Sequence, residues 1–199
     1  MQDFFFKIVN FLKYKFLARH RKGFSVHSPF VFELLNNVFF EKEHYYCYEK
    51  IEKIVAKHTN NSLFFNNLKY YKLFFRLANY FNTQNILIVG KNSFIEKIFN
   101  FVSSKTQIVY AENIEKTQNI DCDLIFFAEN SIKNYKNNKF FFKDNSILIF
   151  ENIYQNRENN NVWQQIKNDN NLKTSIDIFN FGIIIVKKEI PEQHYRIAF

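Results

Sequence analysis

Glycine, proline and cysteine are scarce in this chain of 199 residues, which holds 3 Gly, 2 Pro and 2 Cys. Most turns must therefore be built by other residues, and asparagine suits them because it tolerates left-handed backbone. Cys47 and Cys122 give neither a disulfide framework nor a metal-ligand spacing. We therefore expect both thiols to be reduced in a cytoplasmic protein.

Long apolar runs are missing as well. No uninterrupted apolar stretch reaches the ~18 residues of a membrane span. Lys7, Lys13 and Lys15 interrupt the apolar N-terminus, which therefore does not match a signal peptide. Hydrophobic residues nevertheless make up 47% of the chain and aromatics 20%. This content excludes a disordered chain, and the length suits one domain with its own core.

The charge is strongly positive, with a net value of +8. Such a charge can favour nucleic acid or another anionic surface as a partner. The basic residues are spread along the chain, except for the segment from Lys13 to Lys22. We therefore rank nucleic-acid binding below the other hypotheses.

The N-terminal third predicts helices. Residues 4–18 form an amphipathic pattern because Phe5, Val9, Leu12 and Phe16 recur at helical spacing. The basic segment Arg19–Lys22 and the glycine after it are typical of a helix C-terminus, and a helix lying on a membrane surface is the alternative. Further helices are predicted from a Ser28 cap and Pro29 to residue 39, over 45–58 and over 68–81, with a polar break over 60–67.

The remainder alternates short apolar runs with helical or polar stretches. Strands are predicted over residues 85–89, 107–111, 123–127 and 146–150, with helices over 93–102 and 161–167. Two further strands, 173–179 and 182–188, are close enough to pair antiparallel. This alternation predicts an α/β fold with a mainly parallel sheet and helices on its faces.

Several short motifs occur along nearly the whole chain: Arg19-His20, His27 to Phe32 (beginning HSPF), Tyr45-Tyr46, Glu49 to Glu52, Tyr70 to Phe75, Phe150 to Tyr154, Val162-Trp163 with Ile166-Lys167, Ser175 to Phe179, and Gln193 to Phe199 (QHYRIAF). In this order they resemble a class I S-adenosylmethionine (SAM)-dependent methyltransferase family of the Bacteroidetes type. The resemblance implies a bacterial, cytoplasmic transferase with a Rossmann-like sheet closed by an antiparallel strand.

The resemblance also implies a SAM site at the C-terminal ends of the first strands. The family pattern E-L-G-x-x-x-G here keeps only its first glycine, Gly90, because Ile88 replaces the acid and Phe94 replaces the second glycine. A ring at Phe94 would enter space that a glycine leaves open. Glu112 matches the acid that binds the ribose hydroxyls in the family. Gly90 could equally be a plain strand-to-helix turn, and Glu112 an exposed capping residue.

The segment after Glu112 is too short for the family pattern. Only about a dozen residues lead to the strand at Leu124, and a single crossover helix alone needs ~10–12. We therefore expect the third strand and its flanking helices to be missing. The strand over 107–111 would then be an edge that a partner chain could cover.

At the next two strand ends the family has acids that place substrate or metal. Those positions are Ala128, followed by Glu129, and Glu151-Asn152. The resemblance assigns Glu129 to the cofactor side, and Glu151 and Asn152 to the catalytic side. A hard cation needs several oxygen ligands, and Ala128 supplies none, so we predict no metal site.

The histidines offer little chemistry. His27 and His194 lie in the motifs and could meet in space, but positions in a helix cap and a terminal strand favour structural roles. The sequence suggests no Ser/His/Asp set, phosphate-binding glycine loop or zinc spacing.

Three functions remain: a SAM-dependent methyltransferase, a non-catalytic descendant (a pseudoenzyme) that acts as a homodimer or scaffold for a protein partner, and a basic nucleic-acid binder. The changes at Ile88, Phe94 and Ala128 and the missing strand cluster on one site. We therefore expect a methyltransferase-like protein with weakened or lost SAM binding. Residues 1–82 would form a helical extension packed on a core of residues 83–199.

Overall fold

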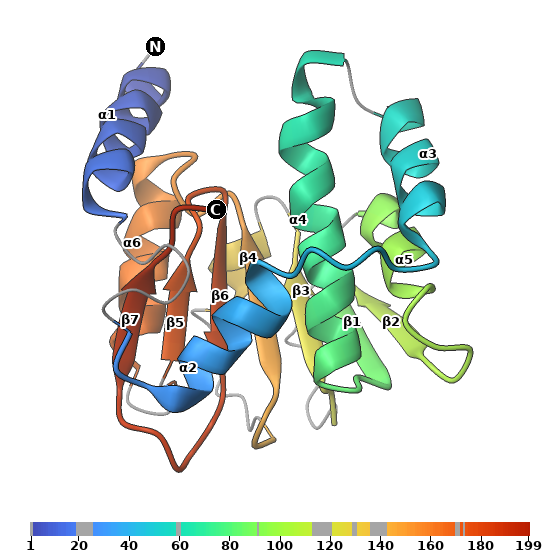
Figure 1. Ribbon diagram of the computed structural model, residues 1–199. Helices are drawn as coiled ribbons and strands as arrows, with labels where there is room; N and C mark the ends of the chain where they lie inside the picture. The colour runs from blue at the N-terminus through green and yellow to red at the C-terminus, as the bar shows by residue number, and fades with distance from the viewer. Residues whose placement is uncertain are drawn as a thin grey trace.

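The computed structural model describes residues 2–18, 26–58, 61–90, 92–112, 121–128, 131–135, 143–169, 172 and 174–199. The basic segment Arg19–Lys22 therefore lies outside the described residues. Helices and strands follow one another in the order α1 (Gln2–Leu17), α2 (Pro29–Leu34), the π-helix η2 (Leu35–Phe39), α3 (Tyr48–His58), α4 (Asn61–Tyr80), β1 (Asn85–Val89), α5 (Ser93–Phe99), β2 (Gln107–Ala111), β3 (Leu124–Phe127), the 3-10 helix η4 (Ser131–Tyr135), β4 (Ile147–Glu151), α6 (Arg157–Lys167), β5 (Thr174–Asp177), β6 (Phe181–Ile185) and β7 (Gln193–Arg196) (Figure 1).

The strands form one seven-stranded sheet in the order β2-β1-β3-β4-β6-β5-β7. β2, β1, β3 and β4 run parallel, and β6 is antiparallel to both β4 and β5. The chain passes from β2 on one side of β1 to β3 on the other side, so β2 is the sheet's edge in the described part of the chain. The predicted parallel sheet, its antiparallel closure and the edge at 107–111 are therefore confirmed.

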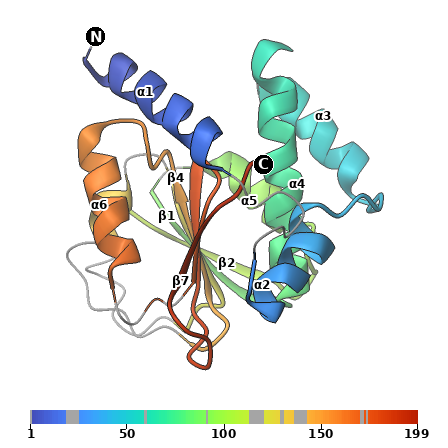
Figure 2. The same ribbon diagram turned by 60° about the vertical axis from the view of Figure 1, so that its left-hand side comes forward.

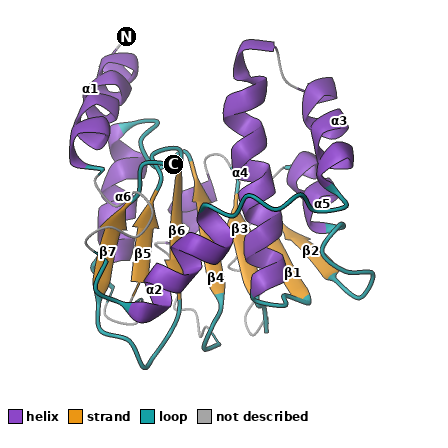
Figure 3. Cartoon of the chain, in the orientation of Figure 1, coloured by secondary structure: helices purple, strands orange, loops and turns teal. Residues whose placement is uncertain are grey.

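Helices cover both faces of the sheet (Figure 2). Along β1, Ile86 and Ile88 contribute to the core beneath α2, α4 and α5, whereas Leu87 and Val89 contribute to the core shared with α6. Burial on both faces explains why the strands read as continuous apolar runs instead of alternating ones. Loops at the two ends of the strands join these layers (Figure 3).

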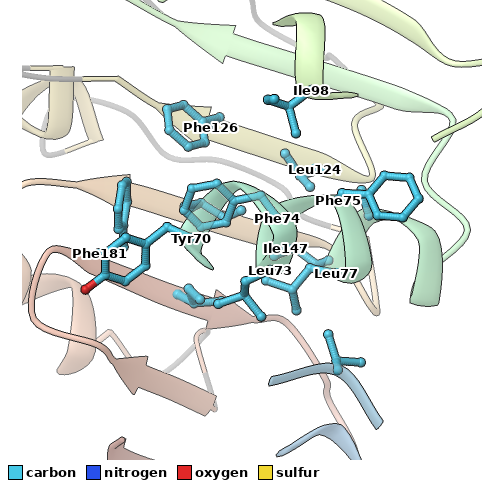
Figure 4. Packing of buried hydrophobic residues seen from close by; sticks show 14 of the residues in the cluster. Tyr70, Leu73, Phe74, Phe75, Leu77, Ile98, Leu124, Phe126, Ile147 and Phe181 are labelled. Atoms are coloured by element: carbon cyan, nitrogen blue, oxygen red, sulfur yellow. The ribbon is translucent and has the colours of Figure 1, made fainter. Parts of the chain in front are cut away.

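Helix α4 supplies the central contacts of the larger core. Leu73, Phe74 and Leu77 are fully buried, and Figure 4 shows them over the strands that carry Leu124 and Ile147. The Phe74 ring meets those of Phe126 and Phe181 edge-on, with centroids 5.7 and 4.8 Å apart. This packing holds α4 against the sheet, and the chain then continues from α4 into β1.

Several helix boundaries predicted from sequence are wrong. Helix α3 begins at Tyr48 instead of residue 45, and α5 ends at Phe99 instead of residue 102. Within the polar break expected over residues 60–67, residues 61–67 are helical, because α4 begins at Asn61. Asparagine costs a helix less than about 1 kcal/mol per residue, and the buried second half of α4 offsets that. Helix α6 begins at Arg157 because the Asn156 side chain accepts a hydrogen bond from the Asn159 amide at 2.8 Å.

The predicted start of α2 is confirmed. Pro29 is the first helical residue, and the Ser28 hydroxyl accepts a hydrogen bond from the Val31 amide at 3.4 Å. The helical segment continues through η2 to Phe39, as expected. Among the described residues, no helix has both the length and the apolar character needed to cross a membrane.

Candidate functional site

Parallel pairing brings the predicted site positions together at the carboxyl ends of the strands. Gly90, Glu112 and Ala128 directly follow β1, β2 and β3, and Glu151 is the last residue of β4. The Gly90 amide donates to the Ala111 carbonyl at 2.8 Å, and the Ala128 amide donates to the Val89 carbonyl at 2.9 Å. Open α/β sheets bind their ligands at these carboxyl ends. Glu129 lies outside the described residues.

Gly90 is packed against the chain itself. Its φ is +87°, and an added Cβ would lie 3.2 Å from the Ser131 Cβ and 3.4 Å from the Ala128 Cβ. Ser131 begins η4 and its hydroxyl donates to the Ala128 carbonyl at 2.6 Å. A glycine is therefore required here by the backbone conformation and by the close approach of Ser131 and Ala128. Ser131 therefore borders Gly90 on the side where a Cβ would point.

Replacing Gly90 with alanine is therefore expected to destabilise the fold. The left-handed backbone and the tight contact together should lower the free energy of unfolding by about 2–3 kcal/mol. Urea unfolding measures this. The control is Gly90→Ala combined with Ser131→Gly, which removes the contact but keeps the backbone strain and should recover part of the loss. A neutral Gly90→Ala variant would contradict this packing.

Phe94 turns its ring toward α4. Helix α5 is capped by Asn92, whose side chain accepts from the Ile95 amide at 3.0 Å, and this places Phe94 in the first turn. The half-buried Phe94 ring meets Tyr71 of α4 edge-on, with centroids 4.5 Å apart. Burial, and then the nearby Glu151 carboxylate, raise the pKa of Tyr71 above its ordinary value. Phe94 and Tyr71 are therefore in contact, and the ring at position 94 belongs to the packing between α4 and α5.

Asn152 has a structural role in the observed turn. Its φ is +59°, a conformation that asparagine adopts more readily than most residues. Its amide donates to the Asn180 carbonyl at 2.7 Å, and its carbonyl accepts from the Asn159 side chain at 3.1 Å. Glu112, by contrast, is exposed beyond β2, and its main-chain carbonyl accepts from the Asn134 side chain at 3.5 Å.

Phe199 packs at the same end of the sheet, beyond the carboxyl ends of the strands, which the sequence did not indicate. Its ring lies 5.6 Å from that of Tyr70 and 5.9 Å from that of Phe39, centroid to centroid. Lys69 donates to the Phe199 carbonyl at 2.6 Å, and burial lowers the pKa of this lysine. Burial also raises the pKa of Tyr70 to about 12, and its hydroxyl accepts from the Asn180 side chain at 3.4 Å.

A Ser–His–Glu set, which the sequence did not suggest, links β5 to β7. The Ser175 hydroxyl lies 2.8 Å from His194 Nδ1, and His194 Nε2 lies 3.1 Å from a Glu192 carboxylate oxygen. Ser175 is paired with His194 in the sheet and only 1% exposed. A substrate cannot reach a hydroxyl buried within the strand, so the set fastens β7 to the sheet. The structural role expected for His194 fits this geometry.

No metal cluster is found where the structure describes the chain: no group of three or more His, Cys, Asp or Glu side chains could hold an ion there. The strand-end carboxylates of Glu112 and Glu151 are separated along the sheet by β1 and β3. Both carboxylates lie at the strand ends, where an organic ligand of an open α/β sheet would meet them.

No protein-family model matches the chain, and no curated protein matches its sequence. Solved structures do match its fold. One is a Staphylococcus aureus protein assigned to the caffeoyl-CoA O-methyltransferases, with 12% identity and a TM-score of 0.50, covering 79% of this chain and 97% of its own. Another is the SAH-bound methyltransferase PaMTH1 of Podospora anserina, with 12% identity and a TM-score of 0.50, covering 81% of this chain and 97% of its own.

These likenesses establish the fold. The chain shares the Rossmann-like fold of these methyltransferases, and β6 is the antiparallel strand of its sheet. The fold does not by itself carry the activity, which depends on the residues at the site.

Proposed function

We propose that this chain is a methyltransferase-like protein in which SAM binding is weakened or lost. The observation that carries the proposal is the contact of Ser131 and Ala128 with Gly90, the surviving glycine of the family pattern. A loop glycine serves a ligand when it leaves room for close approach of the backbone. Here Ser131 and Ala128 of the same chain lie against Gly90.

The second support is the aromatic packing next to this loop. Phe94 stands where the family pattern has its second glycine, and its ring packs on that of Tyr71. A SAM molecule at the strand ends would have to compete with this contact. The acid of the family pattern is replaced by Ile88, which is fully buried and offers no acceptor.

A thermal-shift experiment with SAM and SAH tests the proposal. A ligand present at a hundred times its dissociation constant stabilises the folded state by about 2.7 kcal/mol, which would raise the melting temperature by roughly 5–10 °C in a chain of this size. We expect no rise at millimolar ligand. A clear rise that Glu112→Gln reduces would instead support an active methyltransferase that uses Gly90, Glu112 and Glu151.

Assembly with a second copy is the second candidate. In the described part of the chain, β2 pairs only with β1, and its Val109 and Tyr110 side chains are exposed. An edge strand of this kind can add a strand from another chain. Light scattering tests this candidate: a dimer that Tyr110→Pro dissolves would support it, because the Tyr110 amide points away from β1, and a clean monomer would contradict it.

A further inference from the structure

The N-terminal helix carries an apolar stripe that faces away from the protein. Phe5, Leu12 and Phe16 are 69%, 61% and 80% exposed. At 100° per residue they lie on the side of α1 opposite the buried Tyr14. The stripe that the sequence pattern singles out is therefore not the side of α1 that contacts the core.

Contacts on the other side fix the helix in this orientation. The Tyr14 hydroxyl donates to the Ile197 carbonyl, and its ring lies 5.4 Å from that of Phe179. Phe11 also meets Phe179 edge-on at 5.0 Å. Figures 1 and 2 place α1 at the periphery of the molecule, on the side of α6. Rotating the stripe into the core would break these contacts.

The charges beside the stripe indicate what it contacts. Lys13 and Lys15 are exposed, and Asp3 is the one acidic residue in the helix sequence. The basic segment Arg19–Lys22 follows in the sequence, and the whole chain carries +8. A second copy of α1 would bring mainly like charges to the same place, whereas an anionic surface complements them.

We propose that α1 lies in the surface of an anionic lipid bilayer, with its apolar stripe among the acyl chains. An amphipathic helix with phenylalanine and leucine on one face and lysine at the flanks binds in this way. The lysines strengthen the binding through the negative surface potential of the bilayer. The helix lies along the surface instead of crossing it, so the folded body stays in water.

Vesicle flotation of the full chain tests this. We expect it to float with vesicles of phosphatidylcholine and phosphatidylglycerol, and at least about tenfold less with phosphatidylcholine alone. The variant Phe5→Gln/Leu12→Gln/Phe16→Gln should lose at least about tenfold in binding. Lys13→Gln/Lys15→Gln should weaken binding to the anionic vesicles only.

The matched control is Phe32→Gln/Val109→Gln, which changes two exposed apolar residues elsewhere on the surface. This control should bind like the unaltered chain, and circular dichroism should show all variants folded. Equal flotation of the triple variant and the control would overturn the proposal. So would a lack of lipid binding together with a dimer that the triple variant dissolves, because the stripe would then bind a second copy.

Discussion

Replacing Arg76 with leucine is expected to lower the free energy of unfolding by about 4 kcal/mol. Arg76 is only 6% exposed. Its Nε donates to the Val38 carbonyl at 2.5 Å, its Nη2 to the Phe39 carbonyl at 3.2 Å, and its Nη1 to the Tyr48 hydroxyl at 2.8 Å. The last carbonyls of a helical segment have no partner within it, so leucine would leave two of them buried without a donor.

Urea unfolding of Arg76→Leu measures this loss. The matched control is Arg157→Leu, because Arg157 is exposed at the start of α6 and its loss should change stability by less than about 0.5 kcal/mol. Arg76→Lys should fall between the two, since it keeps the charge but loses the forked geometry. A loss below about 1 kcal/mol for Arg76→Leu would show that η2 and α4 are held together by apolar packing alone.

The second large effect is expected at Gly182, where β6 meets Trp163 of α6. An added Cβ would lie 2.6 Å from both Cη2 and Cζ3 of the indole. Trp163 is fully buried and rigid, and its ring lies 6.0 Å from that of Phe150. Alanine at position 182 must therefore push α6 away from the sheet. We expect this to lower the free energy of unfolding by about 3 kcal/mol.

A double-mutant cycle isolates this contact. Trp163→Phe removes part of the indole, so Gly182→Ala should cost less in the Trp163→Phe background than in the unaltered chain. The difference, measured by urea unfolding, should be at least about 1 kcal/mol. Equal costs in both backgrounds would mean that the added methyl group is accommodated without displacing Trp163.

The sequence predicts the sheet well because its central strands are continuous apolar runs, as over residues 85–89 and 124–127. The end of each run also locates the strand-end positions Gly90 and Glu112. The short segment after Glu112 correctly predicts that β2 is the edge, because loop length limits which crossovers can form.

What the sequence could not predict depends on contacts between distant segments. The packing of Ser131 against Gly90 is set by η4, and nothing in the local pattern specifies it. The stripe of α1 has a core-like period, yet tertiary contacts at Tyr14 decide which side faces the protein. The pairing of Ser175 with His194 likewise depends on the register of β7.

Calorimetric titration of the unaltered chain with SAM tests the central claim most directly. The proposed loss of SAM binding predicts no saturable heat up to millimolar ligand, because Ser131 packs against Gly90 and the Phe94 ring packs against Tyr71. Saturable binding with a micromolar dissociation constant would contradict the claim and place the chain among SAM-binding methyltransferases.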